Sequence, residues 1–88
     1  MKIKDNFVLR TVAGMNVVFP LGADANKFKG LLTLNESGVM LFRLLRNECT
    51  QESLICALVD EYDVSPEQAR ADVNEFIDKL KSVGCIVL

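Results

Sequence analysis

The spacing of hydrophobic residues changes once along this 88-residue chain, close to Leu34. Before that point, apolar residues form short runs rich in β-branched and aromatic side chains, at residues 7–12 and 16–19. Such runs are typical of strands. After it, apolar residues recur at the spacing of one helix face. The pattern therefore predicts an α+β fold in which a sheet precedes the helices.

Three strands are expected in the sheet. Residues 7–12 and 16–19 should form a hairpin, because Gly14 between them tolerates a positive φ. Pro20 should end the second strand, since proline cannot donate a hydrogen bond to the ladder. A loop that starts at Leu21 leads into a third strand at 27–34. The strands would form an antiparallel meander with the second strand in the centre and both outer strands as edges.

The first of three expected helices begins after Asn35, whose side-chain oxygen can accept a hydrogen bond from the first helical turn. Its apolar residues cover more than one face, so the helix should be well buried. Gly38 in the first turn costs about 1 kcal/mol relative to alanine. We expect a close backbone approach to another element to compensate for it. Residues 47–49 interrupt the helical pattern.

Two further helices follow this break. Thr50 caps the second helix, which runs to about Tyr62. The third begins at Ser65, followed by a proline and by Gln68, which is placed to complete a capping box. Gly84 should end this helix. A short apolar tail after it is expected to be strand-like.

Composition restricts the class of protein. The chain is long enough for one domain, residues 1–88, with one core, and half of its residues are hydrophobic. No apolar run is long enough to span a bilayer. The first residues also lack the apolar segment of a secretion signal. We therefore expect a cytoplasmic protein without a membrane partner.

The charges are unevenly distributed. Residues 1–34 carry five lysines and arginines and two aspartates, a net charge of +3, whereas residues 35–88 carry five basic and ten acidic residues, a net charge of −5. The expected sheet is thus basic and the helical part acidic. An acidic peptide could be attracted towards the sheet.

Residues that could carry catalysis are scarce. The chain has no histidine to act as a base near neutral pH. Its cysteines, Cys49, Cys56 and Cys85, form no Cys-x-x-Cys pair, and the acidic residues at 60–67 lack the spacing of a calcium loop. We expect no catalytic residue, no metal and no cofactor. The cysteines should be small thiols in the core or near the surface, in a reducing compartment.

A winged-helix DNA-binding regulator is an alternative for this order of elements. The second and third helices, joined by a tight turn at 63–64, resemble a helix-turn-helix. The third helix would read the DNA, but it carries three basic and four acidic residues. Since DNA affinity depends mainly on neutralising phosphates, this charge argues against nucleic acid as a partner.

The segment Leu34-Asn35-Glu36-Ser37-Gly38, followed by an apolar helix, resembles the Leu-Asn-x-(Thr/Ser)-Gly helix start of the coenzyme PQQ synthesis protein D family. Residues 54–64 and 73–84 also resemble that family, and the resemblance covers residues 5–88. It implies a small winged-helix-like domain, three strands followed by three helices. Such domains bind the leader segment of a ribosomally made precursor peptide and present it to a modifying enzyme, often a radical SAM maturase.

The resemblance also implies where a leader would bind. In the family, the leader adds as a strand beside the third strand and packs against the third helix. The peptide-binding residues carried over to this chain are Lys27, Lys29, Gly30, Leu31, Leu32, Thr33, Arg70, Val73, Asn74 and Ile77. On the third helix, Val73 has the spacing of a core residue. Arg70, Asn74 and Ile77 lie beside the apolar stripe and are better candidates for a groove.

Backbone pairing alone would not hold a leader. Each hydrogen bond contributes a net of about 0.5–1.5 kcal/mol, whereas ordering each peptide residue costs about 1–2 kcal/mol. Side-chain pockets must therefore supply affinity and specificity. Two other possibilities remain open: a homodimer through the edge strand, and a general adaptor that only docks onto an enzyme surface.

Overall fold

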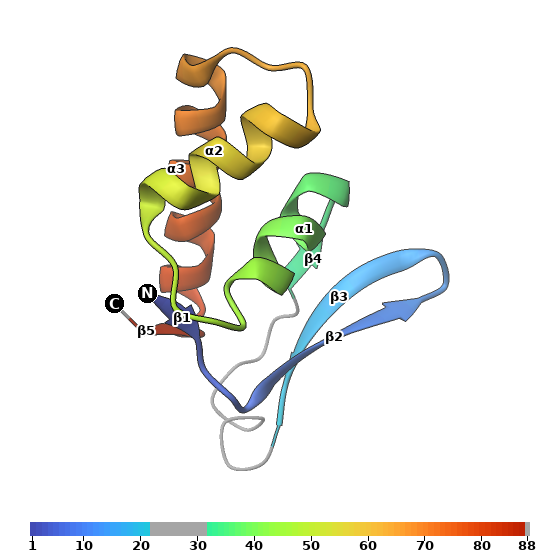
Figure 1. Cartoon of the computed structure of the whole chain (residues 1–88). Coiled ribbons are helices and arrows are strands. Elements are labelled where there is room, and N and C mark those ends of the chain that lie inside the picture. Colours follow the sequence, from blue (N-terminus) through green and yellow to red (C-terminus); the bar gives the residue numbers. More distant parts are fainter. Residues whose placement is uncertain (22–31, 88) are drawn as a thin grey trace.

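The computed structural model describes residues 1–21 and 32–87. Its elements in chain order are β1 (Lys2–Ile3), β2 (Phe7–Val12), β3 (Met15–Pro20), β4 (Leu32–Leu34), α1 (Glu36–Leu44), α2 (Gln51–Glu61), α3 (Pro66–Ser82) and β5 (Ile86–Val87). Figure 1 shows the hairpin of β2 and β3 extending away from the helices, with β1 and β5 side by side. The predicted α+β fold, a three-stranded antiparallel sheet followed by three helices, is confirmed.

The larger sheet has the strand order β2-β3-β4, and both neighbouring pairs are antiparallel. The turn between β2 and β3 contains Ala13 and Gly14, with φ values of 51° and 78°. Positive φ at both positions is the geometry that matches the twist of a hairpin. The second strand is longer than predicted, because it begins at Met15 and includes Pro20, which pairs with Phe7. A proline is tolerated at this strand end.

One face of this sheet packs against the helices. Val18 and Leu34 are 3% and 6% exposed, and both belong to a core cluster that includes residues of all three helices. Leu32 is half-buried against the same core, whereas Thr33 points to the opposite face and is exposed. Residues 27–31 of the predicted third strand lie outside the described residues.

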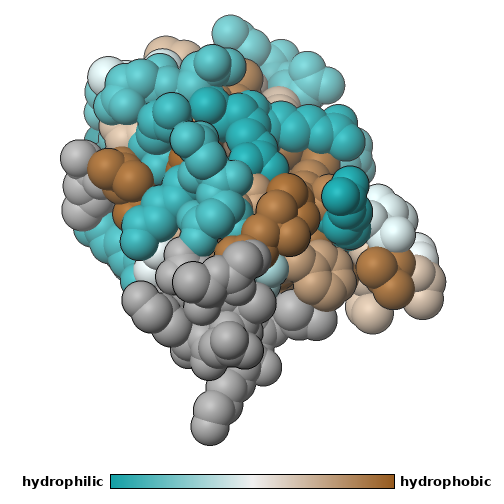
Figure 2. All heavy atoms as spheres, turned by 90° about the horizontal axis from the view of Figure 1, so that it is seen from below, coloured by the Kyte–Doolittle hydropathy of each residue, from teal (hydrophilic) through white to brown (hydrophobic). Residues whose placement is uncertain are grey.

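The far end of the hairpin is exposed. Val12 and Met15, which pair across the two strands, are 49% and 53% exposed. Figure 2 shows apolar spheres at the end of the molecule towards which the hairpin extends. The hairpin end is therefore held by its own strand pairing rather than by burial.

A second, two-stranded sheet joins the chain ends. Ile3 of β1 pairs with Ile86 of β5, which confirms the strand-like tail. Its partner strand was not predicted, because two residues are too few to show an alternating pattern. The Ile3 N–H also donates to the Leu45 carbonyl at 2.8 Å. The first residues are thus fixed to the end of α1.

Each helix begins at a side-chain cap in the predicted place: Asn35, Thr50 and Ser65. Only one of the two hydrogen bonds of the capping box expected for α3 is present, so this prediction is partly wrong. The Ser65 side chain accepts from the Gln68 N–H at 3.1 Å, but the Gln68 side chain donates to Asp72 at 2.8 Å. The reciprocal pair forms instead at the start of α2, between Thr50 and Ser53.

The apolar stripe of α3 faces the core. Val73 and Leu80 are fully buried, and Phe76 is 7% exposed. Ile77 is also 7% exposed, so the expectation that it lies beside the buried stripe is wrong. The reason is that α3 buries a wider face than a single stripe, since it also packs along α2. Gly84, with a φ of 70°, ends the helical segment as predicted.

Leu80→Ala should lower the free energy of unfolding by about 2–5 kcal/mol, because it removes a fully buried side chain and leaves a cavity. Leu44→Ala is the matched control. Leu44 is 39% exposed, and surface substitutions change stability by about 0.5 kcal/mol. Urea denaturation of both variants measures the difference. Equal losses for the two leucines would contradict this assignment of the core.

The three cysteines are free thiols in three environments. Cys49 is half-buried, Cys56 is exposed and Cys85 is buried, which confirms that they lie in the core or near the surface. Burial raises the pKa of Cys85 from its ordinary value of 9.0 to about 11. The folded state therefore holds this proton more strongly than the unfolded chain does.

Stability should fall as the pH rises from 9.0 to about 11, because Cys85 then ionises in the unfolded chain but stays protonated in the folded one. Urea denaturation over this pH range checks the decline. Cys85→Ala should make the decline shallower, whereas Cys56→Ala should leave it unchanged. The same slope in all three proteins would show that Cys85 does not contribute.

Candidate functional site

A groove runs between the end of β4, the start of α1 and one face of α3. It consists of two hollows of about 150 and 340 Å³. We call it the β4–α3 groove. Its β4 and α1 wall is lined by Thr33, Leu34, Asn35, Ser37, Gly38 and Leu41, and its α3 wall by Asp72, Glu75, Phe76 and Lys79.

The start of α1 lies directly on the end of β4. A Cβ atom at Gly38 would lie 3.3 Å from the Leu34 Cβ and 3.2 Å from the Asn35 Oδ1. The predicted close approach at Gly38 is therefore confirmed. The Asn35 Oδ1 accepts hydrogen bonds from the Gly38 N–H at 2.9 Å and from the Ser37 hydroxyl at 3.0 Å. These contacts fix the wall of the groove that faces α3.

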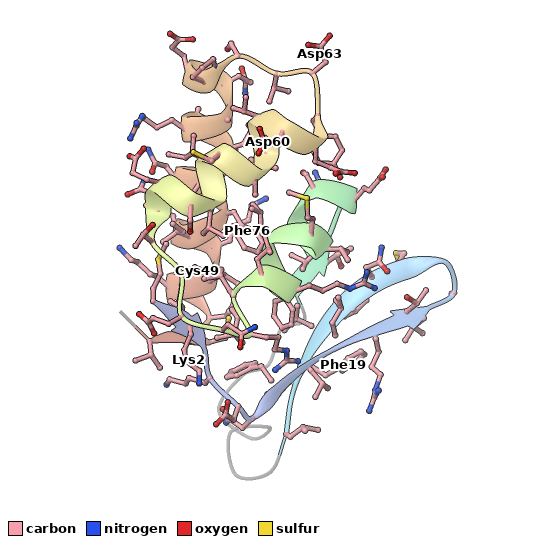
Figure 3. All side chains as sticks on the ribbon, viewed as in Figure 1. Lys2, Phe19, Cys49, Asp60, Asp63 and Phe76 are labelled. Carbon is pink, nitrogen blue, oxygen red and sulfur yellow. The ribbon has the colours of Figure 1, made fainter. Side chains whose placement is uncertain are left out.

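The α3 wall combines an apolar base with a charged rim. Figure 3 shows Phe76 extending from α3 towards α1, and its side chain is 7% exposed. Above it, Lys79 and Glu75 form an ion pair at 3.5 Å, and both side chains are more than half exposed. Asp72 lies one turn earlier and accepts from Gln68. The groove can thus hold an apolar side chain and surround it with polar groups.

A third hollow, of about 260 Å³, continues past the start of α1 towards the turn between α2 and α3. It shares Asn35, Ser37 and Asp72 with the β4–α3 groove and adds Tyr62 and Val64. Desolvation, with smaller effects of nearby glutamates, raises the pKa of Tyr62. Its hydroxyl is therefore a neutral hydrogen-bonding group at this end.

β4 is an edge strand within residues 1–21 and 32–87, because it pairs with β3 on one side only. An edge strand offers unpaired backbone N–H and C=O groups to another extended chain. The open edge predicted from the sequence is present here. It lies beside the hollow that Thr33 and Leu34 line together with Phe76 and Lys79.

The residues predicted for peptide binding on and before β4 lie in different places. Thr33 lines the groove, and Leu32 is half-buried against the core on the opposite face of β4. The predicted contacts in the preceding segment lie outside the described residues: Lys27, Lys29, Gly30 and Leu31. Of the residues predicted for peptide binding in this segment, the structure therefore describes Leu32 and Thr33.

The four α3 residues predicted for peptide binding do not line the β4–α3 groove. Arg70 forms an ion pair with Glu52 at 3.1 Å, and Asn74 accepts a hydrogen bond from Gln51. Both partners belong to α2. The other two predicted residues, Val73 and Ile77, are buried in the core.

The residue spacing in α3 contains a signal for the α3 wall of the groove. Asp72, Glu75, Phe76 and Lys79 recur at three- and four-residue spacing, which places them on one face of α3. That face is the one that meets β4 and α1 in the groove.

The described residues contain no group of three or more His, Cys, Asp or Glu side chains placed to hold a metal ion. In the same part of the chain, no helix combines the length and apolar character needed to cross a membrane.

Comparison with known proteins gives one family and two solved structures. Residues 17–86 match the family coenzyme PQQ synthesis protein D (PqqD). The chain is similar to TbiB1 in complex with the TbiA(beta) leader peptide, with a TM-score of 0.71 and 23% identity over 93% of this chain and 90% of that one. It is also similar to lasso peptide synthetase B1 complexed with the leader peptide, with a TM-score of 0.76 and 15% identity over 99% and 96% of the two chains. No curated protein matches.

Asn35→Ala should lower the free energy of unfolding by about 1 kcal/mol, because the Gly38 N–H loses its partner at the start of α1. Asn35→Ser should restore most of this loss, since serine also caps helices. Asn47→Ala is the control, in the exposed segment after α1. Urea denaturation compares the three variants. An equal loss for Asn47→Ala would show that the cap does not matter.

Proposed function

We propose that this chain, which belongs to the coenzyme PQQ synthesis protein D family, binds the leader segment of a ribosomally made precursor peptide and presents it to a modifying enzyme. The observation that carries the proposal is the open edge of β4 beside the β4–α3 groove. The two similar structures, TbiB1 and lasso peptide synthetase B1, support it, because both hold leader peptides.

The leader would add as an extended strand beside β4. Its backbone would bond to the free edge, and alternate side chains would point into the groove. Leu41 and Phe76 form the apolar base that an aliphatic or aromatic leader residue would cover. The charged rim at Glu75 and Lys79 would select the residues on either side.

The proposed contacts are Leu32 and Thr33 on β4 and Phe76 and Lys79 on α3. From the family resemblance, Lys27, Lys29, Gly30 and Leu31 would extend the docking edge towards an acidic leader. Contacts to Arg70, Val73, Asn74 and Ile77 stay predictions. They would require α3 to release its present contacts with α2 or the core.

The proposed role is that of a non-catalytic adaptor. The family resemblance suggests a radical SAM maturase as the enzyme, and a cytoplasmic location stays a prediction. A DNA-binding regulator is less well supported, because α3 carries four acidic and three basic side chains and so has no positive net charge to neutralise phosphates.

Titration of isotope-labelled protein with the leader of a precursor peptide encoded beside this chain tests the proposal. Amide shifts should cluster on residues 32–34 and 72–79. Shifts that avoid both segments would overturn the site. A salt-sensitive gel shift with duplex DNA, without any response to the leader, would favour the regulator instead.

Lys79→Glu should weaken the binding of an acidic leader on the order of tenfold, because it replaces an attractive charge in the groove by a repulsive one. Lys81→Glu is a matched control in the same helical turn. It changes the net charge equally, but Lys81 does not line the β4–α3 groove. Calorimetric titration measures both affinities. Equal weakening would point to a general charge effect.

A further inference from the structure

A second surface lies along the other edge of the sheet. A hollow of about 250 Å³ is lined by four consecutive residues of β2, residues 8–11, together with Asn16, Phe42, Arg43 and Arg46. Side chains of consecutive strand residues point to opposite faces. A hollow that touches all four therefore follows the edge of β2, between the hairpin and α1. We call it the β2-edge surface.

Three arginines meet at the β2-edge surface: Arg10 from β2, Arg43 from α1, and Arg46 from the turn that follows α1. No carboxylate within 4.0 Å pairs with any of them in the described parts of the chain. Arg70, by contrast, pairs with Glu52. The guanidinium of Arg46 stacks over the Phe42 ring, 4.9 Å from its centroid. Stacking holds this group in place and leaves its N–H groups available.

From these observations we infer that the β2-edge surface docks an acidic, extended segment of the modifying enzyme. The identity of the partner rests on the proposed function, since an adaptor must contact the enzyme while it holds the leader. The chemistry rests on the surface itself. Arginines bind carboxylates through paired N–H···O bonds, and half-buried Val8 and Leu9 provide apolar contact between them.

The position of the β2-edge surface would allow the enzyme segment and the leader to bind at the same time. β2 and β4 are the two outer strands of the sheet, and two strand spacings separate them by about 10 Å. An enzyme segment beside β2 would therefore leave the edge of β4 free for the leader. The hollow has no acidic lining residue, although the chain as a whole has a net charge of −2. The lining residues of this hollow therefore carry a net positive charge.

A fluorescent peptide of alternating glutamate and valine residues serves as the probe. It should bind the full chain, shift the amides of residues 8–11 and of α1, and dissociate when NaCl is raised from about 50 to about 500 mM. The double variant Arg43→Glu/Arg46→Glu should weaken binding by at least about tenfold. Arg43→Gln/Arg46→Gln, which removes the two positive charges but keeps polar side chains without adding negative charge, should give a smaller loss.

Lys4→Glu/Lys81→Glu is the matched control, because it changes the net charge equally at two exposed lysines outside the surface. Equal weakening in the control, or shifts on β4 instead of β2, would overturn the inference. Tighter binding of duplex DNA than of the peptide, or a dimer of this chain that the arginine variants dissociate, would also overturn it.

The two proposals fail in different measurements. Titration with the leader measures binding at the β4–α3 groove. The arginine variants should leave this affinity unchanged. With the purified modifying enzyme as partner, the same variants should lose enzyme binding by at least about tenfold. Normal enzyme binding together with intact leader binding would refute only the β2-edge surface. Absent leader binding would refute the proposed function.

Discussion

The contact between the first turn of α1 and the end of β4 sets the geometry on which the rest of the molecule depends. With only hydrogen at Gly38, the helix start lies on Leu34 without displacing it. The Asn35 side chain bonds the same Gly38 N–H and so ends the strand where the helix begins. A five-residue segment therefore joins the sheet to the helices and determines the width of the β4–α3 groove.

This junction gives the two outer strands different surroundings. At β4, the groove beyond the open edge is closed on its far side by α3, which provides Phe76 and a charged rim. At β2, the neighbouring segment is the end of α1, which provides Arg43, with the turn after it, which provides Arg46. The same sheet thus presents one edge with an apolar base and another that is rich in arginine. The difference arises because the start of α1 lies at β4, whereas its end lies beside β2.

Local signals predicted most of the fold. Asn35, Thr50 and Ser65 begin the helices because their side chains bond to N–H groups only three residues away. The pairing of β1 with β5 depends instead on two residues at opposite ends of the chain. The rotation of α3 depends on residues outside the helix, because its buried face packs against α2 and the rest of the core. The sequence therefore predicted the open edge of β4 but not the face of α3 that lies opposite it.

The shortness of β4 limits what backbone pairing alone could contribute if an extended segment added to its edge. The described part of β4 has three residues, so it can form only a few hydrogen bonds, each worth a net of about 0.5–1.5 kcal/mol. A single apolar side chain buried against Phe76 and Leu41 would contribute about 1.5–3 kcal/mol. One such anchor therefore rivals the whole backbone pairing.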